Sequence, residues 1–392
     1  MKIAFAIEHF NPKQGGAERY AWGLAQWLVR HGHAVDVFTR ETSEDAPAGI
    51  DIRRLAVPAH PRRNRPARFA AALGRALEQR SHDLVQAFNH AWPCDVLRLG
   101  GGVHLAFEKY NAWSAPSPAE RMFRAMLYRV LPQYRALRRN EEHQFNDPDR
   151  HFIAVSQRVA NDMARYYPSC CSRIHMIRNG VDVSVYNPAR VAPLRAQARA
   201  KIGLDESMLA FLFVANNFRL KGLHDLIRAL PIVLKQIGRP LRLLVVGRGH
   251  TEAFRIMACR LGVDKYVQFC GSAPDLIDYF AAADALLHPS YYDAFGFVCL
   301  EAVACGLPVV VSTNSGASEI MHDRPGCVLI DMPCEPAELA GAMLRVAEPA
   351  ARETTRDAQW ALAQEHSMEK NYEAVRVLYE QVSKEKVLRK GL

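Results

Sequence analysis

Strand-like and helix-like segments alternate along this chain of 392 residues in two separate series. In the first series, apolar runs such as "KIAFAI" (2–7) are followed by segments such as "GGAERYAWGLAQWLVRHG" (15–32), whose apolar positions recur at helical spacing. The second series begins with "MLAFLFVA" (208–215) and continues in the same way. Alternation of this kind is typical of parallel sheets wound with helices. The sequence therefore predicts the α/β class, with two doubly wound, Rossmann-like domains.

A linker separates the two series and sets the expected domain boundaries. The stretch "RNGVDVSVYNPARVAP" (178–193) carries the Gly, Asn and Pro residues of a connecting segment. We predict an N-terminal domain over residues 1–185, a C-terminal domain over 194–365, and a helix over 366–392 with the option of crossing back to the N-terminal domain. Ligands of such sheets gather at the carboxyl ends of the strands, so we expect loops of both domains to face one cleft.

Composition excludes several classes of protein. Apolar residues make up 49% of the chain and charged residues 23%, which is typical of a globular protein. No apolar run reaches the roughly 20 residues of a membrane span, and "MKIAFAIEHF" (1–10) reads as a buried strand and not as a signal peptide. The nine cysteines form no CxxC pair, which favours buried free thiols in a reducing compartment. We therefore expect a cytoplasmic protein.

The net charge of +9 is concentrated in two basic clusters. They are "RRLAVPAHPRRNRPAR" (53–68) and "ERMFRAMLYRVLPQYRALRR" (120–139). Such a surplus indicates an anionic partner, for example nucleic acid, a sugar nucleotide or an anionic membrane surface, although the first cluster can equally be a solvated basic face. RNA binding would be favoured by aromatic residues between the arginines, and only Phe69 stands beside the first cluster. We therefore expect no nucleic-acid partner.

The second cluster has the pattern of a basic amphipathic helix over residues 117–139. Ser117, Pro118 and Glu120 form a helix start, with a hydroxyl cap, a proline at the first position and a capping-box acid. Apolar residues then recur at steps of three and four, and Pro132 is expected to bend the helix midway. Such a helix can lie on an anionic membrane surface. The alternative is a helix that packs its apolar stripe on the sheet of the first domain.

Two loops that directly follow predicted strands carry candidate phosphate contacts. In "NPKQGGAER", Gly15 and Gly16 would let the backbone approach a phosphate at a helix N-terminus, or would form a plain tight turn. The chain has no GxGxxG fingerprint of a dinucleotide site. In "NNFRLKG", Arg219 and Lys221 would meet a bound diphosphate, or would be solvated surface charges.

A third stretch, "YYDAFGFVCLEAVACGLPVVV" (291–311), contains two acids that an apolar helix packed on a sheet does not need. Asp293 precedes the expected helix start near Gly296, and Glu301 lies one turn inside the helix. Two carboxylates beside the donor amides of a helix start suit a polyhydroxylated, phosphorylated ligand, with one acid on sugar hydroxyls and the other on a ribose diol. The alternative is an Asp cap with an incidental Glu. The amides at the helix start belong to Ala294, Phe295, Gly296 and Phe297.

The segment "HPSYYDAFGFVCLEAVACGLPVVVSTNSGASEI" (288–320) closely resembles the acid-x7-Glu signature of retaining GT-B glycosyltransferases of family 4. "QGGAER", "IRNGVDVSVYNP" and "LKGLHDLIRAL" match other landmarks of that family in the right order. The resemblance covers nearly the whole chain and implies the GT-B fold. Within the family, the overall pattern is similar to that of the lipopolysaccharide core glucosyltransferases.

The resemblance implies roles for the residues of the C-terminal half. By position, Asp293 matches the acid that contacts the transferred sugar, and Glu301 matches the acid that binds the donor ribose. Lys221 matches the diphosphate lysine, and Phe295 to Phe297 match backbone donors near the sugar hydroxyls. One departure concerns the first acid, which is usually Glu in the family, so that Asp293 is shorter by one methylene.

The N-terminal half contributes fewer matched positions. Gly15 and Gly16 match glycines near the donor phosphates. His104, in "GGGVHLAF", loosely matches a histidine near the sugar, or is a satisfied structural histidine. A second departure is that the arginine common in the family would fall near Asn216, so Arg219 has to supply that charge.

The implied activity is transfer of a hexose, with glucose expected, from a nucleotide sugar, with UDP expected. The acceptor would be a hydroxyl of a glycan or glycolipid such as lipopolysaccharide core. The resemblance also implies reaction on one face of the sugar, in which a leaving phosphate oxygen takes the proton of the acceptor and no side chain is a nucleophile. We expect no cofactor and no metal, and discount "DPD" (147–149) as a metal motif because GT-B chemistry needs none.

Other functions stay open at this stage. One is a GT-B phosphorylase or a nucleotide-sugar-modifying relative, and another is a catalytically silent protein that binds sugar nucleotides or nucleic acid. The intact pair of Asp293 and Glu301 argues against the silent version. Acceptors in the resembling family are often lipid-linked, so we expect a cytoplasmic protein that can bind peripherally to the inner face of the cytoplasmic membrane.

Overall fold

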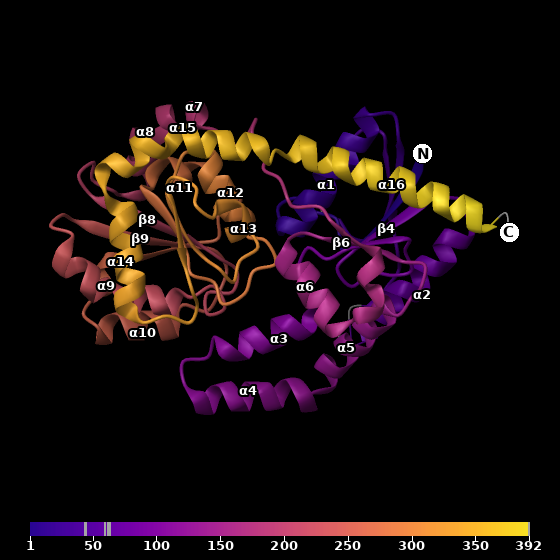
Figure 1. Ribbon diagram of the computed structural model, residues 1–392, viewed down its shortest axis with the longest axis horizontal. Coiled ribbons are helices and arrows are strands. Elements are labelled where there is room, and N and C mark those ends of the chain that lie inside the picture. The colour runs from indigo at the N-terminus through magenta and orange to yellow at the C-terminus, as the bar shows by residue number, and fades with distance from the viewer. Residues whose placement is uncertain (43–44, 59, 61–63, 391–392) are drawn as a thin grey trace. The chain divides into compact units, whose positions relative to one another are not determined.

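The computed structural model describes residues 1–42, 45–58, 60 and 64–390. The chain forms two compact units, each built on its own sheet (Figure 1). Unit 1 consists of Met1–Lys109, Met122–Arg178 and Lys370–Leu392, and unit 2 consists of Tyr110–Arg121 and Asn179–Glu369. The basic cluster 53–68 is only partly covered, because its residues 59 and 61–63 lie outside the described residues.

The described residues of unit 1 form a parallel sheet with the strand order β3-β2-β1-β4-β5-β6-β7. The order reverses between β1 and β4, where Ile3 pairs with Val35 of β2 on one side and with Leu84 of β4 on the other. The strands β4, β5 and β6 are buried along their whole length, as expected where helices cover both faces of a parallel sheet. The strands are β1 (Lys2–His9), β2 (Ala34–Glu41), β3 (Ile50–Arg54), β4 (Leu84–Phe88), β5 (Val96–Arg98), β6 (His151–Ala154) and β7 (Ile174–Met176).

Helices follow most of these strands, as the periodicity predicts. Those that begin in unit 1 are α1 (Gly16–Arg30), α2 (Arg65–Glu78), α3 (His104–Trp113), α5 (Pro132–Phe145), α6 (Gln157–Tyr166) and the 3-10 helix η2 (Pro168–Arg173). The C-terminal end of α3, from Tyr110, and the start of α4 (Pro118–Val130) belong to unit 2. Ser117 caps α4 as predicted, since its Oγ accepts the amide of Glu120 at 3.2 Å.

The prediction of one bent helix over 117–139 is wrong. Leu131 has an extended backbone and Pro132 is the first residue of a separate helix, α5. Proline lacks the N–H that a continuing helix requires, whereas at a first helical position that N–H would be unpaired anyway. The cluster therefore consists of two helices joined at Leu131.

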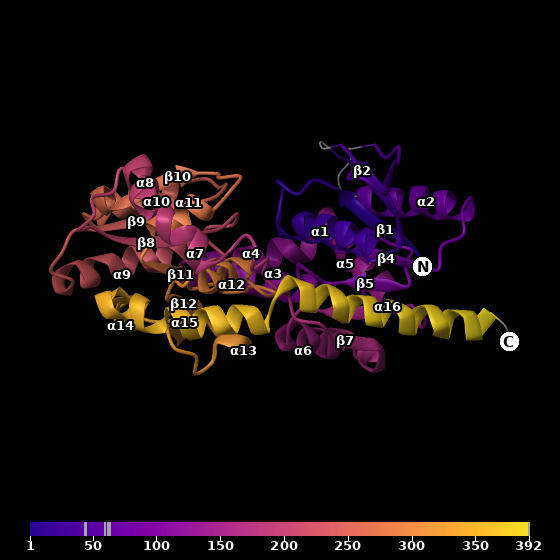
Figure 2. The ribbon, with the colours of Figure 1, turned by 90° about the horizontal axis from the view of Figure 1, so that it is seen from above.

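The last helix, α16 (Met368–Lys390), packs on unit 1 beside α1 (Figure 1 and Figure 2). The ring of Tyr372 lies against the rings of Tyr20 and Trp27. Asn371 accepts a hydrogen bond from the Tyr20 hydroxyl at 2.7 Å and donates to the carbonyl of Arg178 at 2.6 Å. Buried polar contacts of this kind specify how a helix docks, because a shifted helix would leave these groups unpaired.

The described residues of unit 2 form a second parallel sheet, with the order β10-β9-β8-β11-β12-β13. The order reverses between β8 and β11, where Leu286 pairs with Leu212 of β8 and with Val309 of β12. The alternation predicted for this half is confirmed strand by strand. The strands are β8 (Leu209–Val214), β9 (Leu241–Val246), β10 (Val267–Gly271), β11 (Ala285–His288), β12 (Val309–Ser312) and β13 (Cys327–Ile330).

The core of unit 2 forms where α9 covers β8 and its neighbours. Leu223, Leu226, Leu230 and Val233 of α9 are buried at the three- and four-residue spacing that predicted the helix. The helices of this unit are α7 (Pro188–Val191), η3 (Ala192–Leu194), α8 (Arg195–Ile202), α9 (Leu223–Gln236), α10 (Glu252–Arg260), η4 (Asp264–Tyr266), α11 (Ile277–Ala282), α12 (Phe297–Ala304), α13 (Ser318–Met321), α14 (Pro336–Ala347) and α15 (Pro349–Glu365).

Two further expectations concern buried free thiols and the lack of a membrane span. All nine cysteines are free, but Cys171 and Cys259 are exposed, so burial does not extend to every thiol. In the described part of the chain, none of the helices combines the length and the apolarity needed to cross a membrane.

Candidate functional site

The candidate site of unit 2 lies at the point where its strand order reverses. Lys221 follows β8, and Asp293 follows β11, the strand that pairs with β8. Loops at the carboxyl ends of two such strands diverge and leave room for a ligand. The topology therefore brings together two loops that are 72 residues apart in sequence.

The centre of the site is an ion pair held by a histidine. The Lys221 Nζ lies 2.5 Å from Oδ2 of Asp293 and donates to the carbonyl of Tyr292 at 2.9 Å. The His288 Nε2 lies 3.0 Å from the same Oδ2. The other oxygen, Oδ1, accepts only a long bond of 3.3 Å from the amide of Phe295 among the described contacts.

These contacts decide the charge of Asp293. Burial by itself would raise the pKa of the Asp293 carboxyl, but the ammonium of Lys221 and the ring of His288 outweigh burial and hold that pKa well below its usual range. The carboxyl is therefore ionised at neutral pH. A carboxylate with so low a pKa is a weak base and a weak nucleophile, so its chemistry is to accept hydrogen bonds.

Gly222 explains why Lys221 comes so close to Asp293. Its φ of +82° lies in the left-handed region, and a Cβ at this position would lie 2.1 Å from the carbonyl oxygen of Pro289. Only glycine permits both the conformation and the contact. The close approach is reinforced by the amide of Tyr291, which donates to the carbonyl of Leu220 at 2.9 Å.

The start of α12 lies where the sequence predicts it. Gly296 is the N-cap, with a φ of +92°, and the helix begins at Phe297. The amides of Gly296 and Phe297 thus belong to the first helical turn, whose N–H groups have no partner within the helix. Glu301 lies one turn further on and is buried, with 3% exposure. Asp293 therefore lies just before the N-terminus of α12, and Glu301 lies one turn inside the helix, as predicted.

Arg219 is engaged by a segment that precedes it by about a hundred residues. Its Nη2 donates to Oδ1 of Asn111 at 2.8 Å, and its Nη1 lies 3.9 Å from Glu120. In the same segment, the ring of Tyr110 stacks on that of Tyr292, with centroids 5.4 Å apart. Sequence reasoning missed Asn111 and Tyr110, because nothing in their own segment indicates a contact with the second sheet.

The candidates of the first half lie in unit 1. Gly15 is the N-cap of α1 with an extended backbone (φ −173°), and Gly16 is the first helical residue. A Cβ on Gly15 would lie 2.7 Å from an oxygen of Glu18, so a carboxylate occupies the position beside these glycines. His104 is buried at the start of α3, with its Nε2 3.0 Å from Glu108 and its amide donating to Glu141 at 2.6 Å.

A cavity of about 280 Å³ lies at the reversal point of the sheet in unit 1. Its walls combine the apolar rings of Phe69 and Phe88 with the polar side chains of Glu8 and Asn89. The pKa of His90, which also lines the cavity, is lowered to about 4 by burial and by the nearby His104, so that ring is neutral at pH 7. The sequence analysis did not single out this cavity, because its residues come from five separate segments.

The "DPD" motif is occupied by protein contacts. Asp147 accepts a hydrogen bond from Arg150 at 2.7 Å and one from the amide of Asp149 at 3.1 Å. Asp149 also pairs with Arg389. In the described residues, no group of three or more His, Cys, Asp or Glu side chains could hold a metal ion.

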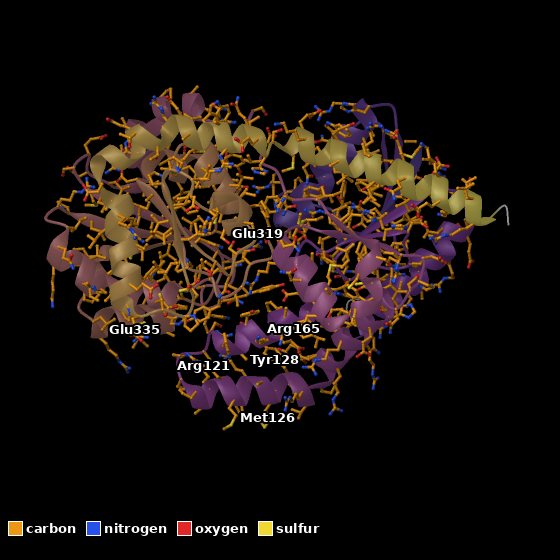
Figure 3. All side chains as sticks on the ribbon, viewed as in Figure 1. Arg121, Met126, Tyr128, Arg165, Glu319 and Glu335 are labelled. Atoms are coloured by element: carbon orange, nitrogen blue, oxygen red, sulfur yellow. The ribbon has the colours of Figure 1, made fainter. Side chains whose placement is uncertain are left out.

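The apolar stripe of α4 is largely on the surface. Figure 3 shows Met126 and Tyr128 on opposite sides of the helix. Tyr128 is buried and its ring meets that of Tyr134. The alternative in which the whole stripe packs on a sheet is therefore wrong for most of α4. The exposed apolar residues are Met122 at 73%, Phe123 at 54%, Met126 at 48% and Val130 at 49%.

Comparisons with known proteins identify related families for both halves of the chain. Residues 14–185 match the family model described as Glycosyltransferase Family 4, and residues 209–348 match the model described as Glycosyl transferases group 1. The chain is 27% identical to the lipopolysaccharide glucosyltransferase WaaG of Escherichia coli (strain K12), over 82% of this chain and 83% of WaaG. It is 30% identical to a D-inositol 3-phosphate glycosyltransferase of Kribbella flavida, over 79% of this chain and 77% of that protein.

Solved structures confirm the fold. The crystal structure of WaaG matches with a TM-score of 0.80 at 24% identity, over 95% of this chain and 98% of that one. Anabaena Alr3699/HepE in complex with UDP-glucose matches with a TM-score of 0.70 at 20% identity, over 97% and 100% of the two chains. The chain therefore belongs to the group 1 and family 4 glycosyltransferases, and it is a glycosyltransferase with two Rossmann-like domains of the GT-B fold.

Proposed function

We propose that the protein transfers glucose from UDP-glucose, with retention of configuration, to a hydroxyl of a glycan or glycolipid such as lipopolysaccharide core. The observation that carries this proposal is the cluster of Lys221, Asp293 and His288 beside the start of α12. Two of the similar proteins support the choice of sugar and donor by their names, one a lipopolysaccharide glucosyltransferase and the other solved with UDP-glucose.

In this mechanism the protein stabilises the charge that develops on the departing diphosphate. The Lys221 ammonium and the amides at the start of α12, which have no partner within the helix, supply positive potential before the reaction begins, so no reorganisation is needed when the bond breaks. Arg219 adds a cation that Asn111 holds in place. These groups do what a metal ion does in other sites, and the proposed reaction uses neither a metal nor a cofactor.

The two acids bind hydroxyl groups of the donor. Asp293 accepts hydrogen bonds from the transferred sugar, and Glu301 accepts those of the ribose diol. Because the pKa of Asp293 is held so low, its carboxylate is poorly suited to attack the sugar. We therefore assign the acceptor's proton to an oxygen of the leaving phosphate and nominate no side-chain nucleophile.

The cavity of unit 1 is our candidate for the acceptor sugar. It lies at a strand-order reversal, as the donor cluster does in unit 2, and it combines aromatic walls with the hydrogen-bonding groups of Glu8 and Asn89. Gln133 and Leu137 of α5 close one side. The helix α5 directly follows α4, whose apolar face is exposed. A cavity next to such a face suits an acceptor whose sugar is attached to a lipid.

A bulky substitution at the cavity wall tests this assignment. We expect Gln133→Trp to raise the acceptor KM at least tenfold while donor hydrolysis without acceptor is unchanged. Glu142→Trp, exposed on the same helix but outside the cavity, is the matched control. Equal acceptor KM values for the two variants would remove the cavity from the acceptor site.

The exposed face of α4 is proposed to bind an anionic membrane surface, which would place the enzyme at the inner face of the cytoplasmic membrane. Met122, Phe123 and Met126 supply apolar area, and Arg129 and Arg135 lie on the same two helices as exposed cations. Apolar burial in the interface and attraction to anionic lipid act together in helices of this kind.

A panel of nucleotide sugars tests the donor assignment. We expect UDP-glucose to raise the melting temperature most and to be hydrolysed slowly without acceptor. At 100 times its Kd, a ligand adds about 2.7 kcal/mol to the free energy of unfolding, which is well within reach of a thermal-shift assay. If another nucleotide or sugar is preferred, the donor assignment fails. If no member of the panel binds or is consumed, the proposed function fails.

A further inference from the structure

His288 is a buried residue at the end of β11 that contacts the centre of the donor site. The residue has 1% exposure, and its Nε2 lies 3.0 Å from Oδ2 of Asp293. It is the last residue of a central strand, so its backbone is held by pairing with β12 through Val311. The ring therefore has a fixed position relative to the loop that carries Asp293.

The protonation state of the ring follows from its surroundings. Burial lowers the pKa of His288, and the neighbouring Asp293 offsets only part of that effect, so the ring is neutral at pH 7. The Asp293 carboxylate can only accept, so the single ring proton lies on Nε2, which donates. This leaves Nδ1 buried with no hydrogen-bond partner in the described part of the chain. A buried polar atom without a partner is rare enough to need a functional explanation.

Lys221 has two tasks that compete for the same ammonium group. In the structure it pairs with Asp293, whereas the proposed function requires it to face the diphosphate of the donor. When it turns to the diphosphate, Asp293 keeps one side-chain donor among the described residues, which is His288. The remaining titratable neighbours of Asp293 add no positive charge beside it, because burial raises the pKa of the Cys299 thiol well above its ordinary value and keeps it neutral, and Glu301 is itself an acid.

We propose that His288 is a positioning residue for the transfer, and that its Nε2–H holds the Asp293 carboxylate in the orientation that receives the sugar hydroxyls. The inference rests on the proposed role of Asp293. By occupying Oδ2, the imidazole leaves Oδ1, with its single long bond to the Phe295 amide, for the sugar. This fixed orientation also explains how a side chain one methylene shorter than the Glu usual in the family can serve.

Two substitutions separate the hydrogen bond from the volume of the ring. His288→Leu removes the donor, and His288→Gln restores an N–H at a similar distance from the backbone. We expect His288→Leu to lower kcat for transfer about tenfold to a hundredfold with little change in UDP affinity, and His288→Gln to recover most of that loss. His224→Leu is the control, since His224 is also buried in the same unit and contacts Tyr291 instead.

The pH profile distinguishes positioning from a merely structural effect. Loss of the Nε2–H donor raises the pKa of Asp293, so the acidic limb of kcat should move to higher pH in His288→Leu and return in His288→Gln. His224→Leu should lower the melting temperature without moving that limb. If His288→Leu folds, binds UDP and keeps the wild-type kcat and acidic limb, the proposal is overturned. It is also overturned if His288→Gln is no better than His288→Leu at equal stability.

Nitrogen NMR of the histidine rings tests the contact without any substrate. We expect the His288 ring of the wild-type protein to be neutral at pH 7 and to carry its proton on Nε2. A neutral ring that carries its proton on Nδ1 would overturn the proposal whatever the activity. A protein that consumes no nucleotide sugar would instead refute the proposed function, while the NMR result would still decide whether His288 donates to Asp293.

Discussion

At the scale of single residues, the donor site depends on a carboxylate that is kept ionised although it is buried. Two effects on the pKa of Asp293 oppose each other, because burial raises that pKa while Lys221 and His288 lower it. The balance makes the site sensitive to the loss of either partner. Gly222 shows the same dependence on one residue, since any side chain there would collide with the carbonyl of Pro289.

Lys221→Met is expected to reduce turnover more than donor affinity, because negative charge builds up on the diphosphate in the transition state. Steady-state kinetics check this, and a variant in which only KM changes would show that Lys221 binds the ground state and the transition state equally.

The same variant also has a predicted pH dependence of stability. In the wild-type protein the folded-state pKa of Asp293 is below the unfolded value of about 3.9, so its contribution to stability is fully present above that value and is lost as pH falls through the folded-state pKa. In Lys221→Met the folded-state pKa rises. The difference in melting temperature between the two proteins should therefore be largest at pH 7 and shrink as the pH falls below 4. A difference independent of pH would contradict the account.

At the scale of secondary-structure elements, the pair α4 and α5 illustrates how one proline changes the role of a helix. Pro132 ends the first helix, so α5 can pack against the sheet of unit 1 while most of the apolar stripe of α4 stays exposed. The arginines of the pair differ as well. Arg138 donates through its Nε to Glu108 at 2.9 Å, whereas Arg135 and Arg139 are exposed.

Binding to vesicles should reflect that difference. We expect sedimentation with anionic vesicles at low salt, no sedimentation with neutral ones, and weakening as salt increases. Replacing Arg135 and Arg139 together by Gln should cost about 2 kcal/mol of binding, because each cation near such a surface contributes about 1 kcal/mol. Arg138→Gln should lower thermal stability more than lipid affinity. Equal binding to neutral and anionic vesicles would refute the electrostatic part of the proposal.

At the scale of the whole molecule, the chain divides its sequence unevenly between two units. Residues from Lys370 onward belong to unit 1, and the segment Tyr110–Arg121 belongs to unit 2. Each unit is therefore completed by a segment that is distant in sequence. Unit 1 depends on the docking of α16 through Asn371, which is bonded to both Tyr20 and Arg178.

Asn371→Ala should destabilise unit 1 by about 1–3 kcal/mol, because the buried Tyr20 hydroxyl would lose its acceptor and the Arg178 carbonyl would lose the donor on Asn371. Calorimetry should show a melting temperature lower by several degrees. The control is Glu373→Ala in the same helix, which breaks only an exposed pair with Arg376 and should cost less than about 1 kcal/mol. The increase in melting temperature caused by UDP should be the same in both variants, since the donor cluster lies in unit 2. Equal stability of the two variants would contradict the docking role of Asn371.

The sequence by itself determined the features that are encoded over short distances. The alternation of strand-like and helix-like segments predicts the two parallel sheets. The positions of Asp293 and Glu301 on either side of Gly296 predict that one acid lies just before the start of α12 and the other one turn inside it. Both patterns are carried by residues that are close together in the sequence. Only the tertiary structure decided that Lys221 and His288 share one oxygen of Asp293, that Asn111 holds Arg219, and that α4 leaves its apolar face exposed. Those contacts join segments whose meeting depends on strand order and on how helices pack. No local pattern records them, since the free energy that selects them is distributed over the whole core.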